Sequence, residues 1–293
     1  MELNIWVEKY RPKLLDDMIL DIDIKEKFQY YIDNGIQNNL LFSGPPGIGK
    51  TTIAKILLNL LKKKINIMWL NGSDSRGINI IREQIAGFIS TKTFMDRKVV
   101  CIDEGEALTT EAFGALKGLI EEYYTNASFI LTTNFLYKVP EAIRSRFIIY
   151  EFKKPNKNDT IELYKKILNS ENVKYKDENL EMLYNMSGGD LRKSIHYMQD
   201  NSRKGEFILN FKVYNEIVNF YKEKDIKGLK KYIAENNISD YEYLYRYFYD
   251  RINSFEGIIV IGKYLYQHSF VVDPEINFVC MIIDLINLKK SKK

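Results

Sequence analysis

Gly44-Pro45-Pro46-Gly47-Ile48-Gly49-Lys50-Thr51 reads G-x-x-x-x-G-K-T, which is the spacing of a phosphate-binding loop. The apolar run 39–43 before it predicts a strand, and residues 52–61 after it carry apolar side chains at helical spacing. In that context the glycines let backbone N–H groups turn toward phosphates, and the helix N-terminus adds partial positive charge. The stretch therefore predicts a nucleoside triphosphate site, where Lys50 reaches the β- and γ-phosphates and Thr51 ligates Mg²⁺.

Short apolar runs alternate with helical patterns from residue 39 to residue 152. This alternation predicts an α/β fold with a parallel, doubly wound sheet, and ligands bind such sheets at the carboxyl ends of the strands. The expected strands are 39–43, 66–70, 98–102, 128–132 and 148–152, with helices between them that include 78–89 and 110–124.

The pattern changes near Lys153-Lys154-Pro155, after which only helices are expected. The alternating tyrosines of 241–249 are interpreted as a helix that packs on other helices, because charged residues interrupt the alternation. A base-stacking surface is the alternative for the same tyrosines. The expected helices are 157–169, 177–187, 189–201, 207–223, 225–235, 239–253, 256–268 and 274–290.

Polar residues follow two of the expected strands. Asp103, directly after 98–102, is expected to help hold Mg²⁺, and Glu104 is expected to act as the general base on the attacking water. Asn134 ends the next strand, and its amide is expected either to orient the water or to contact the γ-phosphate. Arg146 and Arg192 are candidates to stabilise phosphate charge, and the residues alone leave open which of them acts within its own chain.

Composition limits the class of protein. A formal charge of +4 over 293 residues permits a polyanionic partner without requiring one. The two cysteines, Cys101 and Cys280, lie in separate apolar runs, which suits a reducing compartment and gives no zinc-ligand spacing. We find no signal peptide and no run long enough to span a membrane, so a cytoplasmic location is expected.

Several segments together resemble the sliding-clamp-loader ATPases, namely the replication factor C small subunits and their tailed-phage counterparts. The resemblance covers about residues 5–200 and leans toward the phage type, which would place the protein in the host cytoplasm. It rests on the phosphate loop together with Trp6-Val7-Glu8-Lys9-Tyr10-Arg11-Pro12, Asn71-Gly72-Ser73-Asp74-Ser75-Arg76-Gly77-Ile78, Asp103-Glu104, Thr133-Asn134, Ser145-Arg146-Phe147 and Gly188-Gly189-Asp190-Leu191-Arg192-Lys193.

The resemblance implies an AAA+ organisation. A nucleotide-binding domain would occupy 1–153, a helical lid 154–204, and a helical collar 205–293 that assembles a pentameric ring with other loader subunits. Arg146 would be the finger that reaches the ATP of the adjacent subunit, whereas Arg192 would act in its own chain. The implied nucleotide-binding set is Tyr10, Arg11, Gly44, Pro45, Pro46, Gly47, Ile48, Gly49, Lys50, Thr51, Thr52, Asn134 and Arg192.

The resemblance also implies contacts with DNA. Arg76 and Arg82 fall in a segment that would grip backbone phosphate without reading bases, and Lys117 occupies a position that is basic in the family. A solvated helix face is the alternative for the two arginines. The chain departs from the family pattern at Glu106, where the usual residue is Asp, and at Gly118, which replaces a second basic residue.

We therefore expect an ATPase subunit of a sliding-clamp loader, which opens the clamp and loads it onto primer–template DNA during replication, with ATP and Mg²⁺. One alternative is another AAA+ DNA-remodelling ATPase, such as a branch-migration helicase or a replication initiator, which would usually add a winged-helix module. Another is a scaffold that binds ATP without turnover, against which the intact Lys50, Asp103 and Glu104 argue.

Overall fold

The computed structural model describes residues 5–74, 77, 79, 81–95, 97–202, 205–209, 212–236, 238 and 240–290. The chain divides into two compact units, Met1–Phe207 and Ile208–Lys293. Among the described residues, no helix is long and apolar enough to cross a bilayer.

A five-stranded parallel sheet is the centre of the first unit, with the strand order β2-β3-β4-β1-β5. The strands are β1 (Leu40–Ser43), β2 (Ile65–Asn71), β3 (Arg97–Asp103), β4 (Ala127–Thr133) and β5 (Ile148–Glu151). Each lies within one residue of its predicted bounds, which confirms the α/β fold. Because β3 pairs with β4 and β4 with β1, the phosphate loop, Asp103 and Asn134 all follow neighbouring strands at one edge.

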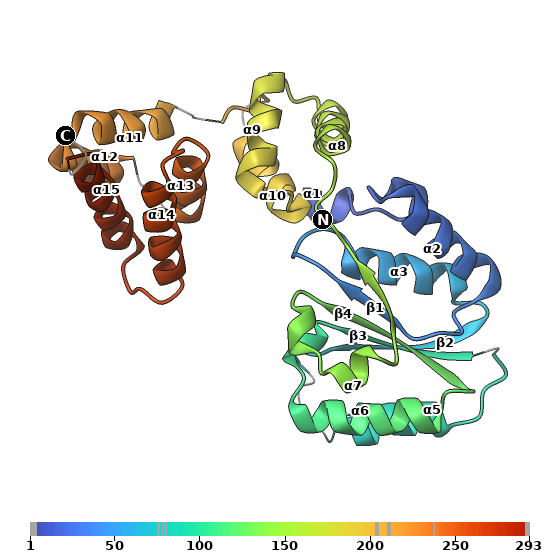
Figure 1. Cartoon of the computed structure of the whole chain (residues 1–293). Coiled ribbons are helices and arrows are strands. Elements are labelled where there is room, and N and C mark those ends of the chain that lie inside the picture. The colour runs from blue at the N-terminus through green and yellow to red at the C-terminus, as the bar shows by residue number, and fades with distance from the viewer. Residues whose placement is uncertain are drawn as a thin grey trace. The chain divides into compact units, whose positions relative to one another are not determined.

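Helices cover both faces of this sheet (Figure 1). Successive strand residues point to opposite faces, so Val99 and Cys101 enter one core whereas Val100 and Ile102 enter the other. The first face carries α2 (Ile22–Asn34) and α3 (Lys50–Leu61); the second carries η2 (Ile81–Ile85), α5 (Ala86–Ser90), α6 (Thr110–Glu122) and α7 (Glu141–Arg144). Short helical turns η1 (Leu15–Asp17), η3 (Gly105–Ala107) and η4 (Leu136–Lys138) connect these elements.

The predicted helix 78–89 differs from the observed structure. Ile81–Ile85 within it form a π-helical turn, η2, which α5 follows as an α-helix. Ile78, the first residue of the predicted range, lies outside the described residues. Apolar spacing predicted a helical segment here, but it does not distinguish α- from π-helical hydrogen bonding.

Three helices complete the first unit: α8 (Lys157–Ser170), α9 (Asp177–Ser187) and α10 (Leu191–Asn201). The Asp190 carboxylate accepts from the Lys193 backbone N–H at 2.9 Å and so caps α10. The N-terminal helix α1 (Trp6–Lys9) packs on α10, and the Trp6 backbone N–H donates to the Gln199 side chain at 3.0 Å. The N-terminal segment is therefore held by the helical part of this unit.

The described part of the second unit is helical, with α11 (Lys212–Glu223), α12 (Ile226–Glu235), α13 (Tyr241–Tyr249), α14 (Phe255–His268) and α15 (Pro274–Lys290). Tyr243, Tyr245 and Tyr247 of α13 are buried among aromatic neighbours, which confirms the packing interpretation over base stacking. Two predicted helices were too long: residues 207–209 are not helical, and α13 ends at Tyr249 rather than at residue 253.

Both cysteines are free. Cys101 is buried in β3, where burial raises the pKa of its thiol, whereas Cys280 in α15 is only half-buried. The described residues contain no cluster of three or more His, Cys, Asp or Glu side chains that could hold a metal ion.

Candidate nucleotide-binding site

The phosphate loop between β1 and α3 needs glycine at defined positions. Gly47 has a φ of +72°, and a Cβ there would lie 1.8 Å from the Asp190 carboxylate oxygen. Gly44 has a φ of +148°, and a Cβ there would lie 2.3 Å from the Phe152 carbonyl oxygen. The Leu191 N–H also donates to the Gly47 carbonyl at 3.1 Å. The loop is thus in direct contact with the start of α10, and larger residues would separate them.

Lys50 is folded back into the loop at the start of α3. Its ammonium donates to the carbonyls of Gly44 (2.8 Å) and Pro45 (2.6 Å) and to Asn134 Oδ1 (2.8 Å). Only 7% of the residue is exposed, and burial lowers the pKa of Lys50 to about 8, against the opposing effect of the Glu106 and Asp103 carboxylates. A triphosphate offers this buried ammonium stronger acceptors than neutral carbonyls.

Thr51 and Asp103 lie side by side. The Thr51 hydroxyl donates to Asp103 Oδ1 at 2.8 Å, and the Thr132 hydroxyl donates to the same oxygen. Mg²⁺ in nucleotide sites is bound by one or two protein oxygens together with phosphates and water, so no larger protein ligand cluster is needed. Thr51 and Asp103 therefore fit the metal site that the sequence predicted.

Glu104 follows Asp103 in a left-handed conformation, with φ +54° and ψ +46°. Its backbone N–H donates to the Thr132 hydroxyl at 3.0 Å, which holds this conformation. The side chain accepts from the Ser73 hydroxyl, with Ser73 Oγ 2.6 Å from Oε2. A non-glycine residue in this conformation is costly and is most often retained at functional sites.

Glu106 contacts Asn134 on the neighbouring strand end. Its Oε1 accepts from the Asn134 backbone N–H at 3.0 Å and from the Asn134 side-chain Nδ2 at 2.9 Å. Because Asn134 Oδ1 accepts from Lys50, the three side chains form one hydrogen-bonded chain across the site. The sequence singled out Glu106 only as a departure from the family pattern, and nothing in it predicted this contact.

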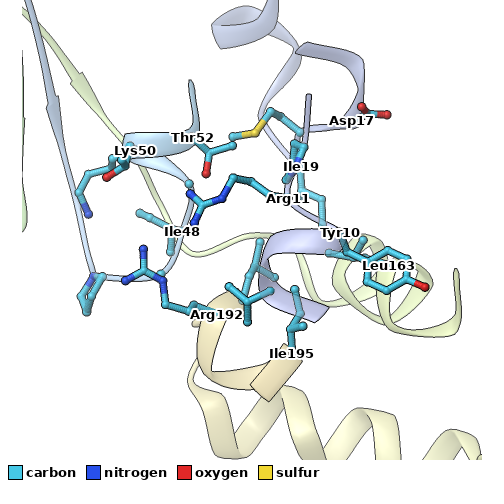
Figure 2. Close-up of a pocket in the computed structure, with 18 of the residues that line it drawn as sticks. Tyr10, Arg11, Asp17, Ile19, Ile48, Lys50, Thr52, Leu163, Arg192 and Ile195 are labelled. Carbon is cyan, nitrogen blue, oxygen red and sulfur yellow. The ribbon is translucent and has the colours of Figure 1, made fainter. Parts of the chain in front are cut away.

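A cavity of about 470 Å³ adjoins the phosphate loop. The N-terminal segment contributes Tyr10 and Arg11, and the helical part contributes Leu163, Arg192 and Ile195 (Figure 2). In this view the guanidinium groups of Arg11 and Arg192 point toward the loop around Ile48. The cavity brings together all of the predicted nucleotide-binding residues except Gly44 and Pro45, which lie next to it in the loop.

Tyr10 is held by a residue that the sequence did not predict. The Tyr10 hydroxyl lies 2.7 Å from Glu171 Oε1, and the Lys9 ammonium lies 2.6 Å from the same oxygen. These contacts join residues more than 160 positions apart in the chain, one at the N-terminus and one at the end of α8. They fix the N-terminal wall of the cavity to the helical wall.

Arg146 lies at the opposite edge of the sheet. It precedes β5, and its backbone carbonyl accepts from the Asn39 side chain, directly before β1. The guanidinium pairs with Glu121 of α6 and donates to the Ala142 carbonyl at 2.6 Å. Parallel strands put their starts and ends at different edges, so Arg146 is separated from Lys50 by the length of β1. Arg192, by contrast, lines the same cavity as Lys50.

The predicted DNA-contacting residues are partly described. Arg82 is exposed in η2 and Lys117 is half-buried in α6, and these two helices contact each other. Arg76 lies outside the described residues. Arg82 and Lys117 therefore come from adjacent helices on one face of the sheet.

Comparison with known proteins shows the family of the chain. Residues 40–154 match the family described as ATPase family associated with various cellular activities (AAA). The replication factor C small subunit of Aeropyrum pernix is 36% identical over 77% of this chain and 70% of the relative. The chain belongs to the replication factor C small-subunit family of AAA+ clamp-loader ATPases.

Other replication factor C small subunits show similar identity. That of Picrophilus torridus is 35% identical over 81% of this chain and 76% of the relative. That of Sulfurisphaera tokodaii is 37% identical over 69% of this chain, but the match spans only 63% of the relative's length.

Solved structures support the fold. A Thermotoga maritima RuvB mutant aligns with a TM-score of 0.56 and 22% identity, over 89% of this chain and 79% of that one. The T. maritima RuvB Holliday junction branch migration motor aligns with a TM-score of 0.54 over 78% of this chain and 86% of that one, also at 22% identity. At this identity the likeness shows a shared fold and carries no statement about activity.

Proposed function

We propose that this member of the replication factor C family hydrolyses Mg·ATP in response to DNA, and that hydrolysis drives the loading of a sliding clamp onto primer–template DNA. The observation that supports turnover, beyond binding, is the convergence of Lys50, Asp103, Glu104 and Asn134 at one edge of the sheet. A protein that only bound ATP would have no need for the last two.

The residues divide the chemistry between them. Lys50 exchanges its carbonyl partners for the β- and γ-phosphates, and Thr51 with Asp103 would hold Mg²⁺, which would supply neutralisation of phosphate charge. Glu104 accepts the proton of the attacking water as general base. Arg192, on the wall formed by α10, contacts the phosphates from within the same chain and joins nucleotide binding to the helical lid.

Arg146 acts on a neighbouring subunit. Since it lies at the edge where the strands begin, it does not share a cavity with the phosphate loop of its own chain. It would instead face the ATP of the next subunit in a ring, and an arginine supplied in this way raises hydrolysis by ~10³–10⁵-fold in related nucleotidases. Other loader subunits and a sliding clamp are the implied partners, in a ring of five.

DNA would reach the site through Arg76, Arg82 and Lys117. Arg82 and Lys117 lie on helices η2 and α6, and α6 follows the strand that ends in Asp103. Guanidinium and ammonium groups bind backbone phosphate without reading sequence, which suits a protein that recognises the shape of a primer–template junction.

The test is steady-state ATP hydrolysis by the purified chain, alone and with primed DNA and a candidate sliding clamp, with Arg146→Ala in parallel. We expect clamp and DNA to raise the rate several-fold, and Arg146→Ala to abolish it. A fully reconstituted set of subunits that hydrolyses ATP at the same rate with and without DNA would refute the loader function.

The second candidate is a branch-migration helicase or replication initiator. Its winged-helix module requires strands, whereas the described part of residues 208–293 consists of helices α11 to α15. A non-hydrolysing scaffold is the third, and a Glu104→Gln variant that hydrolyses ATP like wild type would favour it over the catalytic assignment.

A further inference from the structure

We propose that Glu106 is a positioning residue, which turns the Asn134 amide so that its oxygen faces the reacting phosphate and accepts a hydrogen bond from the attacking water. Asn134 would then orient the water, and would not donate to the γ-phosphate. This inference rests on the proposed hydrolysis at the site and decides between the two roles that an amide there could have.

The partners of Asn134 identify the two ends of its amide. The Lys50 ammonium can only donate, and it lies 2.8 Å from the amide oxygen. Glu106 Oε1, as part of a carboxylate, accepts, and it lies 2.9 Å from the amide nitrogen. The same Oε1 also accepts from the Asn134 backbone N–H at 3.0 Å, so the side chain is fixed relative to its own backbone. If the amide were flipped, its oxygen would face Glu106 Oε1 and its NH₂ group would face the Lys50 ammonium. Two acceptors would then oppose each other, and so would two donors.

The turn that carries Glu106 is held tightly against β4. Gly105 packs on Leu131, and a Cβ at Gly105 would lie only 2.3 Å from the Leu131 side chain. Leu131 and Asn134 belong to the same strand end, so Glu106 and Asn134 keep their relative positions. This rigidity is what a positioning residue requires.

The second carboxylate oxygen of Glu106 supports a functional role. Oε2 is buried and has no hydrogen-bond partner among the described residues. An unpaired buried oxygen costs stability, so its presence calls for an explanation other than structural need.

The consequence appears when ATP is bound. Lys50 transfers its donors to the phosphates, which frees Asn134 Oδ1 as an acceptor, while Nδ2 stays bonded to Glu106. The water oxygen attacks the γ-phosphorus, the bond to the β–γ bridging oxygen breaks, and that oxygen leaves with ADP. Glu104 takes the proton of the water and releases it to solvent. Asn134 holds the other water hydrogen and so aligns the attack.

Three variants test this in the full chain, with Mg·ATP and primed DNA: Glu106→Leu, Glu106→Gln and the double variant Glu106→Leu/Asn134→Asp. Leu removes the acceptor, and we expect kcat to fall at least tenfold while the Kd for ATP stays within about threefold, since the phosphate loop is unchanged. Gln keeps one acceptor oxygen and should retain at least a third of the wild-type kcat. Glu111→Leu, on the exposed start of α6, is the matched control and should behave as wild type.

The double variant tests the role of the oxygen. Asp at position 134 presents an oxygen whichever way it turns, and the pair of substitutions conserves net charge. We therefore expect kcat to recover several-fold relative to Glu106→Leu. A double variant no better than Glu106→Leu, or a Gln variant as inactive as Leu, would overturn the proposal. Wild-type hydrolysis in the same assay tests the proposed function separately. The proposal about Glu106 is tested only by the kcat of each variant relative to the wild-type kcat.

Discussion

Arg146 and Glu121 form an ion pair at the edge of the sheet where the strands begin, opposite the edge where Lys50 lies. The Arg146 Nε lies 3.0 Å from Glu121 Oε1, and the guanidinium also contacts the Ala142 carbonyl and the Ser145 hydroxyl. Most of its N–H groups are thus occupied within the chain. The pair is partly exposed, so it is weak and can exchange for a phosphate supplied by another subunit.

If Arg146 acts on the ATP of a neighbouring subunit, two variants that are inactive alone should restore activity to each other when mixed. Arg146→Ala and Lys50→Met should each reduce ATP hydrolysis by assembled subunits at least 100-fold, because one lacks the finger and the other the phosphate ligand. An equal mixture places an intact phosphate loop beside an intact finger at about a quarter of the interfaces. We therefore expect the mixture to regain activity that neither variant has alone, measured as phosphate release. A mixture as inactive as its components would contradict action between subunits.

The lowered pKa of Lys50 predicts a pH dependence of nucleotide binding. In the free protein burial brings the pKa of Lys50 to about 8, and only the charged ammonium binds the triphosphate strongly. Bound phosphate raises this pKa again. Above pH 8 the free protein must therefore take up a proton to bind ATP, and the Kd should rise by up to tenfold per pH unit.

The measurement is fluorescent ATP-analogue titration between pH 6.5 and 9.5. Lys50→Met is the control: it should bind weakly, with a Kd that changes little over this range. A wild-type Kd that stayed constant to pH 9.5 would show that the Lys50 ammonium is not held in the way its burial indicates.

We expect the hydrogen bond from the Ser73 hydroxyl to restrain the side chain of Glu104. This hydrogen bond occupies Glu104 Oε2, so this oxygen must be released before it can accept the proton of the attacking water. We expect Ser73→Ala to raise ATP hydrolysis in the absence of DNA by about two- to fivefold, a small factor because Glu104 is solvent-accessible.

Ser90→Ala is the matched control: it removes an exposed hydroxyl that donates to the Gly87 carbonyl, and it should leave the rate unchanged. A fall in DNA-independent hydrolysis on Ser73→Ala would mean that Ser73 supports Glu104 rather than restrains it.

The sequence predicted those site residues that follow a strand or lie in a loop with its own signature. Lys50, Asp103 and Asn134 are of this kind, because apolar runs mark the strands and parallel pairing brings their ends together. Partners such as Ser73 and Glu171 could not be predicted, since they are common polar residues whose contacts depend on how distant segments pack. The sequence did not predict the π-helical turn Ile81–Ile85 either, because apolar spacing does not determine the hydrogen-bonding register of a helix.

The contact between Tyr10 and Glu171 predicts an effect on nucleotide affinity alone. Tyr10 forms part of the cavity wall, and its hydroxyl is fixed by the Glu171 carboxylate at 2.7 Å. Tyr10→Phe and Glu171→Gln should each weaken ATP binding about three- to tenfold, because the N-terminal wall loses a hydrogen bond to a charged group. At saturating ATP, kcat should stay near wild type, since neither residue reaches the phosphates.

The double variant Tyr10→Phe/Glu171→Gln separates this from general destabilisation. If Glu171 acts on ATP through the Tyr10 hydroxyl, the Kd of the double variant for ATP should be close to that of the single variant that binds ATP less tightly. Independent effects would instead multiply the two increases in Kd. Glu181→Gln breaks the exposed pair with Lys157 between α8 and α9 and is the matched control, with an unchanged Kd expected. Multiplying effects in the double variant, or a Glu181→Gln variant that binds as weakly as Glu171→Gln, would show that the helical wall is merely loosened and that Tyr10 is not the residue being positioned.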